Sequence, residues 1–95
     1  FESIFSRQIQ GIGQSKDVLV GITTSGNSKN IIAAVKQAKY KNIKTVVFTG
    51  SSGGMIKDLA DITIFIPSNN TQRIQEAHIM TGQIICGLIE ESLLK

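Results

Sequence analysis

Three short apolar runs constrain the fold of this chain more than any other feature of its sequence. They are Asp17 to Thr23 (DVLVGIT), Lys44 to Thr49 (KTVVFT) and Asp61 to Pro67 (DITIFIP). β-Branched residues are frequent in all three, and their hydrophobicity is continuous rather than alternating. Such runs are typical of strands that are covered on both faces, as in a parallel sheet. The sequence therefore predicts three buried parallel strands.

Helical patterns separate and flank these strands. Ser28 is a suitable N-cap for a helix whose apolar residues recur at helical spacing up to Ala38, and Asn42 stands where a C-terminal stop belongs. Further helices are expected over Ile4 to Ile12, Met55 to Leu59 and Thr71 to Leu94. This alternation predicts right-handed βαβ crossovers and an α/β fold, an open parallel sheet flanked by helices.

The sheet expected from this chain is incomplete. Both edges of a three-stranded parallel sheet would be exposed, while its faces still need covering. The chain has 95 residues, fewer than the roughly 100–150 of a common domain, and it begins with Phe1 rather than Met. We therefore expect residues 1–95 to be the C-terminal part of a single domain, carrying three strands of a larger sheet.

Composition argues against two kinds of partner. The net charge is +3, the lysines are dispersed, and the aromatic residues are four Phe and one Tyr. Nucleic-acid binders usually show a basic stripe with interleaved aromatics, so no nucleic-acid partner is expected. No apolar run reaches the ~20 residues that a bilayer requires, so no membrane span is expected.

The last predicted helix is apolar almost all round from Ile79 onward. Its apolar residues are Ile79, Met80, Ile84, Ile85, Cys86, Leu88 and Ile89. A helix that is apolar on every side is buried on every side. We therefore expect it to pack against the sheet on one flank and against another subunit on the other, in a homo-oligomer. Cys86 is the only cysteine, which favours a reducing, cytoplasmic setting, and it is expected to be a buried thiol.

The segment from Thr23 to Ser28 (TTSGNS) predicts an anion site. Ligands of open α/β sheets bind beyond the carboxyl ends of the strands, and this loop lies between a strand and a helix N-terminus. It carries four hydroxyl side chains, and the helix dipole and free N–H groups there attract phosphate. Gly26 would let the backbone approach the anion closely. The alternative is that Asn27 and Ser28 only cap the helix, with no ligand.

The pattern also narrows the kind of phosphate. No lysine follows Gly26, and no G-x-G-x-x-G is present, so neither a nucleoside triphosphate nor a dinucleotide is expected. Neutral hydroxyl donors without a lysine suit a monophosphate.

Several motifs resemble one family. G-I-T-T-S-G-N-S at 21–28, followed by a helix and the V-V-F-T-G strand at 46–50, resembles the sugar isomerase (SIS) domain. Segments similar to its phosphoheptose isomerase branch are F-S-R-Q-I at 5–9, G-G-M at 53–55, I-P-S at 66–68 and R-I-Q-E-A-H at 73–78. The resemblance implies a SIS-type, flavodoxin-like fold. It also implies an isomerase that interconverts sedoheptulose 7-phosphate and D-glycero-D-manno-heptose 7-phosphate in bacterial heptose biosynthesis for lipopolysaccharide or capsule.

The resemblance further implies the assembly and the site residues. Members are cytoplasmic homotetramers with active sites at subunit interfaces, and several bind zinc. By position, the implied sugar-phosphate contacts are Thr23, Thr24, Ser25 and Ser28, and Gln75 would contact substrate and ligate zinc. The general base, a glutamate, and a histidine metal ligand are implied in a region that precedes residue 1.

One position departs from the family pattern. A catalytic, metal-binding histidine usually stands eight residues after the glutamine of R-I-Q-E, and here that residue is Gln83. Glutamine cannot shuttle a proton near neutral pH and is a poorer zinc ligand. Gln75 and Gln83 are also ~12 Å apart along a straight helix. Gln83 therefore raises an alternative, a non-catalytic SIS protein that acts by protein–protein contact, as the similar replication-initiator-associating protein does. A sugar-phosphate sensor or an amino-sugar-phosphate enzyme is a third reading, which R-I-Q-E-A-H disfavours.

The remaining polar residues of this motif have simpler interpretations. His78, the only histidine, could support the site or carry a proton in place of the missing histidine. Beside Ala77 and Ile79 on a packed helix, it is interpreted as a structural residue. Arg73 and Glu76 are spaced i, i+3 and predict an ion pair on the helix surface.

Overall fold

A three-stranded parallel sheet forms the centre of the structure. The computed structural model describes residues 3–94, and Phe1, Glu2 and Lys95 lie outside the described residues. The strands are β1 (Val18–Ile22), β2 (Lys44–Thr49) and β3 (Ile62–Phe65), in the order β1-β2-β3. In register, Val20 pairs with Val46, which in turn pairs with Ile62. The predicted parallel sheet and its three strands are confirmed.

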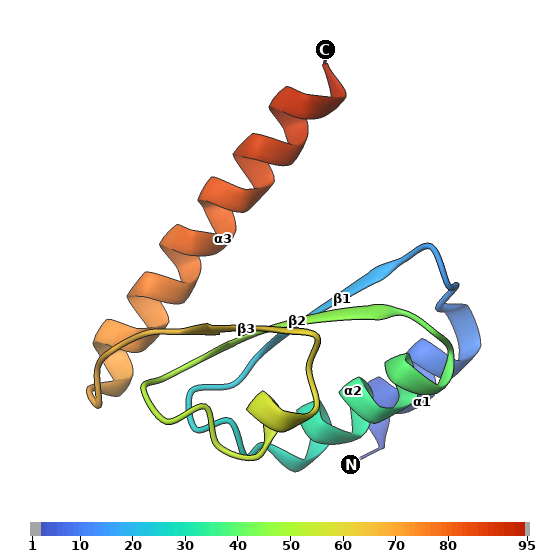
Figure 1. Ribbon diagram of the computed structural model, residues 1–95, viewed down its shortest axis with the longest axis horizontal. Coiled ribbons are helices and arrows are strands. Elements are labelled where there is room, and N and C mark those ends of the chain that lie inside the picture. The colour runs from blue at the N-terminus through green and yellow to red at the C-terminus, as the bar shows by residue number, and fades with distance from the viewer. Residues whose placement is uncertain (1–2, 95) are drawn as a thin grey trace.

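Helices cover both faces of this sheet to different extents. They are α1 (Ile4–Ile12), α2 (Lys29–Tyr40) and α3 (Thr71–Leu93), and a single 3₁₀ turn η1 (Ile56–Asp58) replaces the short helix expected over 55–59. Helices α1 and α2 pack on each other beneath the sheet, whereas α3 crosses the opposite face and then runs away from it (Figure 1). The expected α/β architecture is confirmed.

The apolar core lies between α2 and the sheet. Val35 of α2, Val47 of β2 and Ile56 of η1 are completely buried and contact one another. Val47 faces this core, while its neighbour Phe48 faces α3, as alternation along a strand requires. Continuous hydrophobicity along β2 therefore reflects packing on both faces.

The element ends follow the expected local chemistry, with one exception. Asn42 adopts φ +62° directly after α2, as a C-terminal stop does. Asn70 caps α3, because its side-chain oxygen accepts hydrogen bonds from the N–H groups of Gln72 and Arg73. Ser28 is the N-cap of α2 by position, but its hydroxyl contacts the side chain of Asn30 instead of a helix N–H.

Large apolar surfaces remain exposed in this chain. On β1, Val18, Val20 and Ile22 are each more than half exposed on the face opposite α2. Helix α3 packs on β2 through the turns around Ile74 and His78 and then passes beyond the sheet (Figure 1).

The expectation that Cys86 is a buried thiol is wrong for this chain, in which the residue is exposed. The reason is its position on the part of α3 that has no sheet beneath it. Among residues 3–94, no helix combines the length and the hydropathy needed to cross a membrane.

Candidate functional site

A polar hollow of about 430 Å³ lies where β1, β2 and β3 end. Three loops build it, one after each strand, and the first turns of α3 close it. Its lining residues are Thr24, Ser25, Gly50, Ser51, Ser52, Ser68, Asn69, Thr71 and Ile74. All of these are uncharged, and six carry hydroxyl groups. Because α3 begins at Thr71, the positive end of its dipole borders the hollow.

The first loop continues the pairing of β1 with β2. The N–H of Thr23 donates to the carbonyl of Phe48 at 3.0 Å, and the N–H of Gly50 donates to the carbonyl of Thr24 at 3.0 Å. The side chain of Thr23 is buried, and its Oγ1 accepts a hydrogen bond from the N–H of Gly26. Thr23 therefore shapes the loop, while Thr24 and Ser25 line the hollow.

Close contact between the first two loops explains Gly26. Its φ is +74°, and a Cβ atom there would lie 2.1 Å from the carbonyl oxygen of Gly53. The side chain of Asn27 reinforces this contact, because its Oδ1 accepts a hydrogen bond from the N–H of Met55 at 2.8 Å. The lack of a side chain at Gly26 therefore makes room for the backbone of the neighbouring loop. The predicted close approach to an anion at Gly26 stays a prediction.

The second and third loops are also tied together. The hydroxyl of Ser51 donates to Oδ1 of Asn69 at 2.7 Å, which joins the loop after β2 to the loop after β3. The hydroxyl of Ser68 accepts a hydrogen bond from the N–H of Asn70, next to the start of α3. The side chain of Lys57 contacts the second loop, since its Nζ donates to the carbonyl of Ser52 at 3.4 Å. The residues that line the hollow are therefore uncharged, and the ammonium group of Lys57 lies behind the wall that Ser52 forms.

Sequence reasoning identified part of this lining and missed the rest. Of the predicted contacts, Thr24 and Ser25 line the hollow, whereas Thr23 and Ser28 belong to the loop around it, and Gln75 lies exposed on α3 outside the lining. The missed residues are Ser51, Ser52, Ser68, Asn69 and Thr71. The signal that could have found them is their position, because each follows the carboxyl end of β2 or β3.

The metal ligands that the sequence implied do not form a site by themselves. Gln75 and Gln83 are both exposed on α3, and amide oxygens are weak ligands for zinc compared with thiolate, imidazole or carboxylate. Within residues 3–94, no three His, Cys, Asp or Glu residues are grouped closely enough to hold a metal ion. The described residues therefore do not fit zinc without further ligands.

His78 and the Arg73–Glu76 pair agree with their simpler interpretations. His78 is 2% exposed, and its Nε2 lies 2.9 Å from the carbonyl oxygen of Thr49. Arg73 and Glu76 form the expected i, i+3 ion pair, with 2.9 Å between nitrogen and oxygen, on the exposed side of α3.

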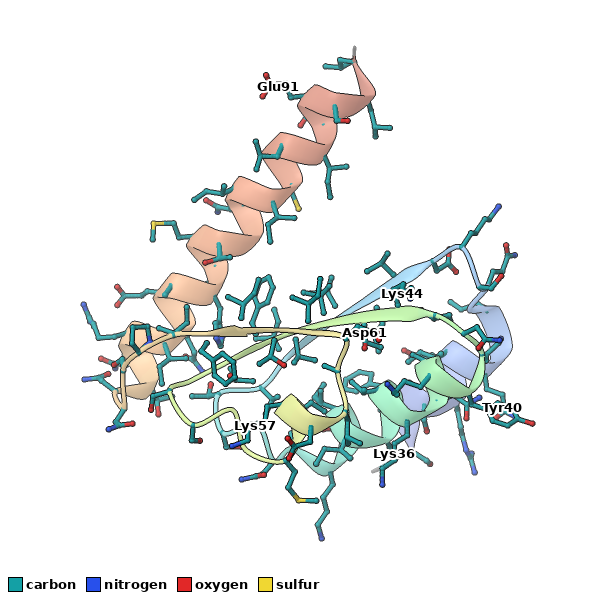
Figure 2. The ribbon with its side chains drawn as sticks, in the orientation of Figure 1. Lys36, Tyr40, Lys44, Lys57, Asp61 and Glu91 are labelled. Carbon is teal, nitrogen blue, oxygen red and sulfur yellow. The ribbon has the colours of Figure 1, made fainter. Side chains whose placement is uncertain are left out.

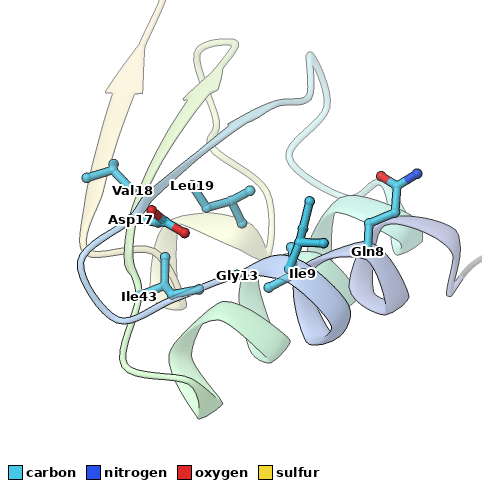
Figure 3. A pocket seen from close by; sticks show the side chains of 8 residues that line it. Gln8, Ile9, Gly13, Asp17, Val18, Leu19 and Ile43 are labelled. Carbon is cyan, nitrogen blue, oxygen red and sulfur yellow. The ribbon is translucent and has the colours of Figure 1, made fainter.

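Two other hollows lie at the opposite end of the sheet and suit a phosphate less well. One, of about 370 Å³, lies between the end of α1 and the start of β1, with Ile9, Leu19 and Ile43 in its wall and Asp17 at its edge (Figure 3). The other, of about 230 Å³, contains Asp61 beside the start of β2 (Figure 2). Asp17 in the first would repel an anionic ligand. The second also contains Lys39 and Lys44, but it lies at the amino ends of the strands, opposite the edge at which parallel sheets bind ligands.

The fold and the hollow together define a class of protein, an α/β domain with a polar hollow at the carboxyl edge of a parallel sheet, the edge at which such folds bind ligands. The family follows from comparison with known proteins. Residues 4–86 match the family model described as the SIS domain, so the chain belongs to the SIS domain family.

Similar curated proteins include phosphoheptose isomerases. The chain is 54% identical over 93 residues to a phosphoheptose isomerase of Leptospira biflexa, covering 98% of this chain and 48% of that protein. It is 52% identical over 92 residues to a phosphoheptose isomerase of Nitratiruptor, covering 97% of this chain and 49% of that protein. The chain therefore spans about half the length of the curated relatives it matches.

Solved structures agree with this assignment. A phosphoheptose isomerase from Neisseria gonorrhoeae superposes with a TM-score of 0.91 at 41% identity, covering 94% of this chain and 51% of that one. One from Francisella tularensis gives a TM-score of 0.92 at 37% identity, covering 96% and 49%. The fold expected from the resemblance to SIS domains is confirmed.

Proposed function

We propose that this chain is the phosphate-binding, C-terminal part of a phosphoheptose isomerase. The observation that carries the proposal is the similarity along nearly the whole chain to proteins of that name, at up to 54% identity among those described above. The hydroxyl-lined hollow supports it independently, because neutral hydroxyl donors near a helix N-terminus suit a sugar monophosphate.

The proposed reaction interconverts sedoheptulose 7-phosphate and D-glycero-D-manno-heptose 7-phosphate through an enediol. A base removes the proton from the carbon beside the carbonyl and returns it to the neighbouring carbon. The share of this chain is to hold the phosphate group through Thr24, Ser25 and the serines of the second loop. Fixing the phosphate orients the sugar relative to the base, and orientation is a major part of such rate accelerations. The base itself lies outside the described residues.

The same proposal covers domain and assembly. Residues 1–95 would be the C-terminal part of one SIS domain, in which preceding strands pair with the free edge of β1 and preceding helices cover Val18, Val20 and Ile22 on its face. The protein would be a cytoplasmic homo-oligomer, a tetramer by resemblance to the family. Support for an oligomer comes from the outer half of α3, where Ile84, Leu88 and Ile89 are each more than half exposed.

Zinc has no part in the steps assigned to this chain. Gln75 and Gln83 offer only amide groups, so a zinc ion would need its stronger ligands from outside residues 3–94. The role of zinc in the whole protein is therefore included in the experiment below as a variable.

Gln83 favours a second candidate function. A SIS protein that acts only by protein–protein contact does not need a proton-transferring side chain at this position, and glutamine cannot supply one. Turnover separates the two candidates, because both would retain the fold and the hollow.

The decisive experiment is a turnover assay. The full-length protein that contains this chain is mixed with sedoheptulose 7-phosphate, with and without zinc, and the aldose product is followed by NMR. The isomerase proposal predicts product in at least one of the two conditions. No product in either condition would reject it in favour of the non-catalytic candidate.

Ser25→Ala tests the assignment of the hollow. The hydroxyl of Ser25 lines the hollow and also accepts a hydrogen bond from the N–H of Asn27 at 3.1 Å. Its loss should weaken binding of sedoheptulose 7-phosphate roughly tenfold, as expected for one hydrogen bond to a charged group. Isothermal titration calorimetry measures the effect. Ser15→Ala, in an exposed turn between α1 and β1, is the matched control and should bind as the wild type does. Unchanged affinity in Ser25→Ala would contradict the assignment.

A further inference from the structure

His78 is buried where α3 crosses the end of β2. Its side chain is 2% exposed, and its ring packs at a tilt against Phe48, with 5.7 Å between ring centroids. Its Nε2 lies 2.9 Å from the carbonyl oxygen of Thr49, the last residue of β2. This is a contact between residues that are far apart in sequence, and it fixes α3 on the sheet.

The partner of His78 determines its tautomer. A carbonyl oxygen can only accept a hydrogen bond, so Nε2 must carry the hydrogen. Nδ1 is buried and has no hydrogen-bond partner among residues 3–94. Within residues 3–94, the ring therefore hydrogen-bonds through Nε2 alone.

The carbonyl that His78 holds is a junction of three segments. Besides Nε2 of His78, the Thr49 oxygen accepts a hydrogen bond from the N–H of Ile66 at 3.1 Å. One oxygen thus joins the end of β2 to α3 and to the residue that follows β3. Thr49 is completely buried, so no water replaces these donors from the protein surface.

This junction lies directly behind the wall of the hollow. The residue after Thr49 is Gly50, which lines the hollow and donates from its N–H to the carbonyl of Thr24. Space at Gly50 is tight, because a Cβ atom there would lie 2.9 Å from Cδ1 of Ile74 and 2.9 Å from the Thr24 oxygen. A shift of the Thr49 carbonyl would therefore move Gly50 and the serines that follow it relative to Thr24 and Ser25.

We propose that His78 is a positioning residue of the ligand hollow. By donating from Nε2 to the Thr49 carbonyl, it sets the position of Gly50, Ser51 and Ser52 relative to the loop after β1. The inference rests on the proposed function in that the ligand is a sugar phosphate. It adds a residue that shapes the site from behind without touching the ligand.

Three substitutions separate this role from space filling. In His78→Gln the amide nitrogen can reach the position of Nε2, whereas in His78→Asn the shorter side chain cannot, and His78→Leu has no donor. Binding of sedoheptulose 7-phosphate and of inorganic phosphate is measured by calorimetry on folded, full-length protein. We expect affinity within about threefold of the wild type for the Gln variant and a loss of roughly tenfold for Asn and Leu, the usual effect of one hydrogen bond. Wild-type affinity in His78→Leu would overturn the proposal.

A measurement on the wild-type protein covers the case in which a variant does not fold. ¹⁵N NMR of the imidazole, assigned with His78→Gln, should show hydrogen on Nε2 and a shift of that resonance on saturation with inorganic phosphate. Hydrogen on Nδ1 alone, or no shift at saturation, would overturn the inference. Failure of the proposed function looks different, since phosphate would then bind and shift the resonance while sedoheptulose 7-phosphate is not converted.

Discussion

Gln83 lies on the exposed side of α3, eight residues after Gln75, and its neighbours on the helix are exposed as well. A side chain in such a place is free to differ without disturbing the core. By resemblance to the phosphoheptose isomerase branch, this is the position at which a histidine is expected, and we propose that its identity affects turnover.

Replacing Gln83 by histidine should raise turnover. An imidazole in position to transfer a proton contributes roughly 10²–10⁴-fold to such reactions, so we expect at least about a tenfold gain in kcat for sedoheptulose 7-phosphate. Stability should change by no more than about 0.5 kcal/mol, because the site is exposed. Steady-state kinetics and thermal unfolding check both expectations. Gln83→Asn is the control, and a gain there, or none in Gln83→His, would contradict the role assigned to this position.

At the scale of single residues, the sequence predicts which loop forms the hollow better than it predicts which side chains of that loop face the hollow. Thr24 and Ser25 were assigned to the ligand and line the hollow, but their neighbour Thr23 turns its hydroxyl to Gly26. Adjacent residues of a loop share composition and position along the chain. Which side chain faces the ligand depends on φ and ψ angles that the Gly26–Gly53 contact sets.

At the scale of elements, β2 and β3 are joined at their starts by Asp61 and Thr45. Asp61 accepts hydrogen bonds through Oδ2 from the N–H of Thr45 at 2.8 Å and from its hydroxyl at 3.1 Å. The N–H of Asp61 donates back to the Thr45 hydroxyl at 2.9 Å. The hydrogen bond from the Thr45 N–H, then that from its hydroxyl, and more weakly Lys39 and Lys44, lower the pKa of Asp61 below its ordinary value.

Asp61 should therefore make stability depend on pH. A carboxylate with a lowered pKa in the folded state stabilises the fold above its unfolded pKa, near 4, and this stabilisation is lost as pH falls through the folded pKa. Asp61→Asn should thus lower the urea midpoint at pH 7, with a smaller difference from the wild type at pH 3. Asp58→Asn, in the exposed turn of η1, is the control. An equal difference at both pH values would contradict the prediction.

Elements were predicted well because their signals are local. The continuous runs that ended at Thr23 and Pro67 gave strands that end one or two residues earlier, at Ile22 and Phe65. Proline has no N–H to donate to a sheet, which explains the shorter β3. The 3₁₀ geometry of η1 was missed, because three residues carry too little periodicity to distinguish helix types.

At the scale of the whole molecule, the outer half of α3 exposes a set of large apolar side chains, Ile84, Leu88 and Ile89. Burial of Cys86 was expected from its apolar neighbours, and in the single chain it is exposed. The sequence shows that the outer half of α3 is apolar on all sides. The segments or chains that cover each side lie outside the described residues. The Neisseria and Francisella structures are about twice as long as this chain.

Leu88→Asp tests whether this surface is an interface between copies. Leu88 is 60% exposed in the single chain, and burying a leucine contributes about 1.5–3 kcal/mol. A charge there should raise the dissociation constant of the full-length oligomer at least about tenfold, as measured by analytical ultracentrifugation. Tyr40→Asp is the matched control, since Tyr40 is also an exposed apolar residue on a helix, at 84%. Dissociation by both variants, or by neither, would reject this interface.

The part of α3 beyond the sheet would link folding to concentration in the proposed homo-oligomer. A helical segment without tertiary contacts is marginally stable in water, because most helical stability in proteins comes from packing of an apolar face. The last turns of α3 therefore gain their order from whatever packs on them. If a second copy packs on these turns, dilution separates the subunits and frays the helix end in a single equilibrium. The slowest amide hydrogen exchange in these turns then reports association rather than the stability of one chain.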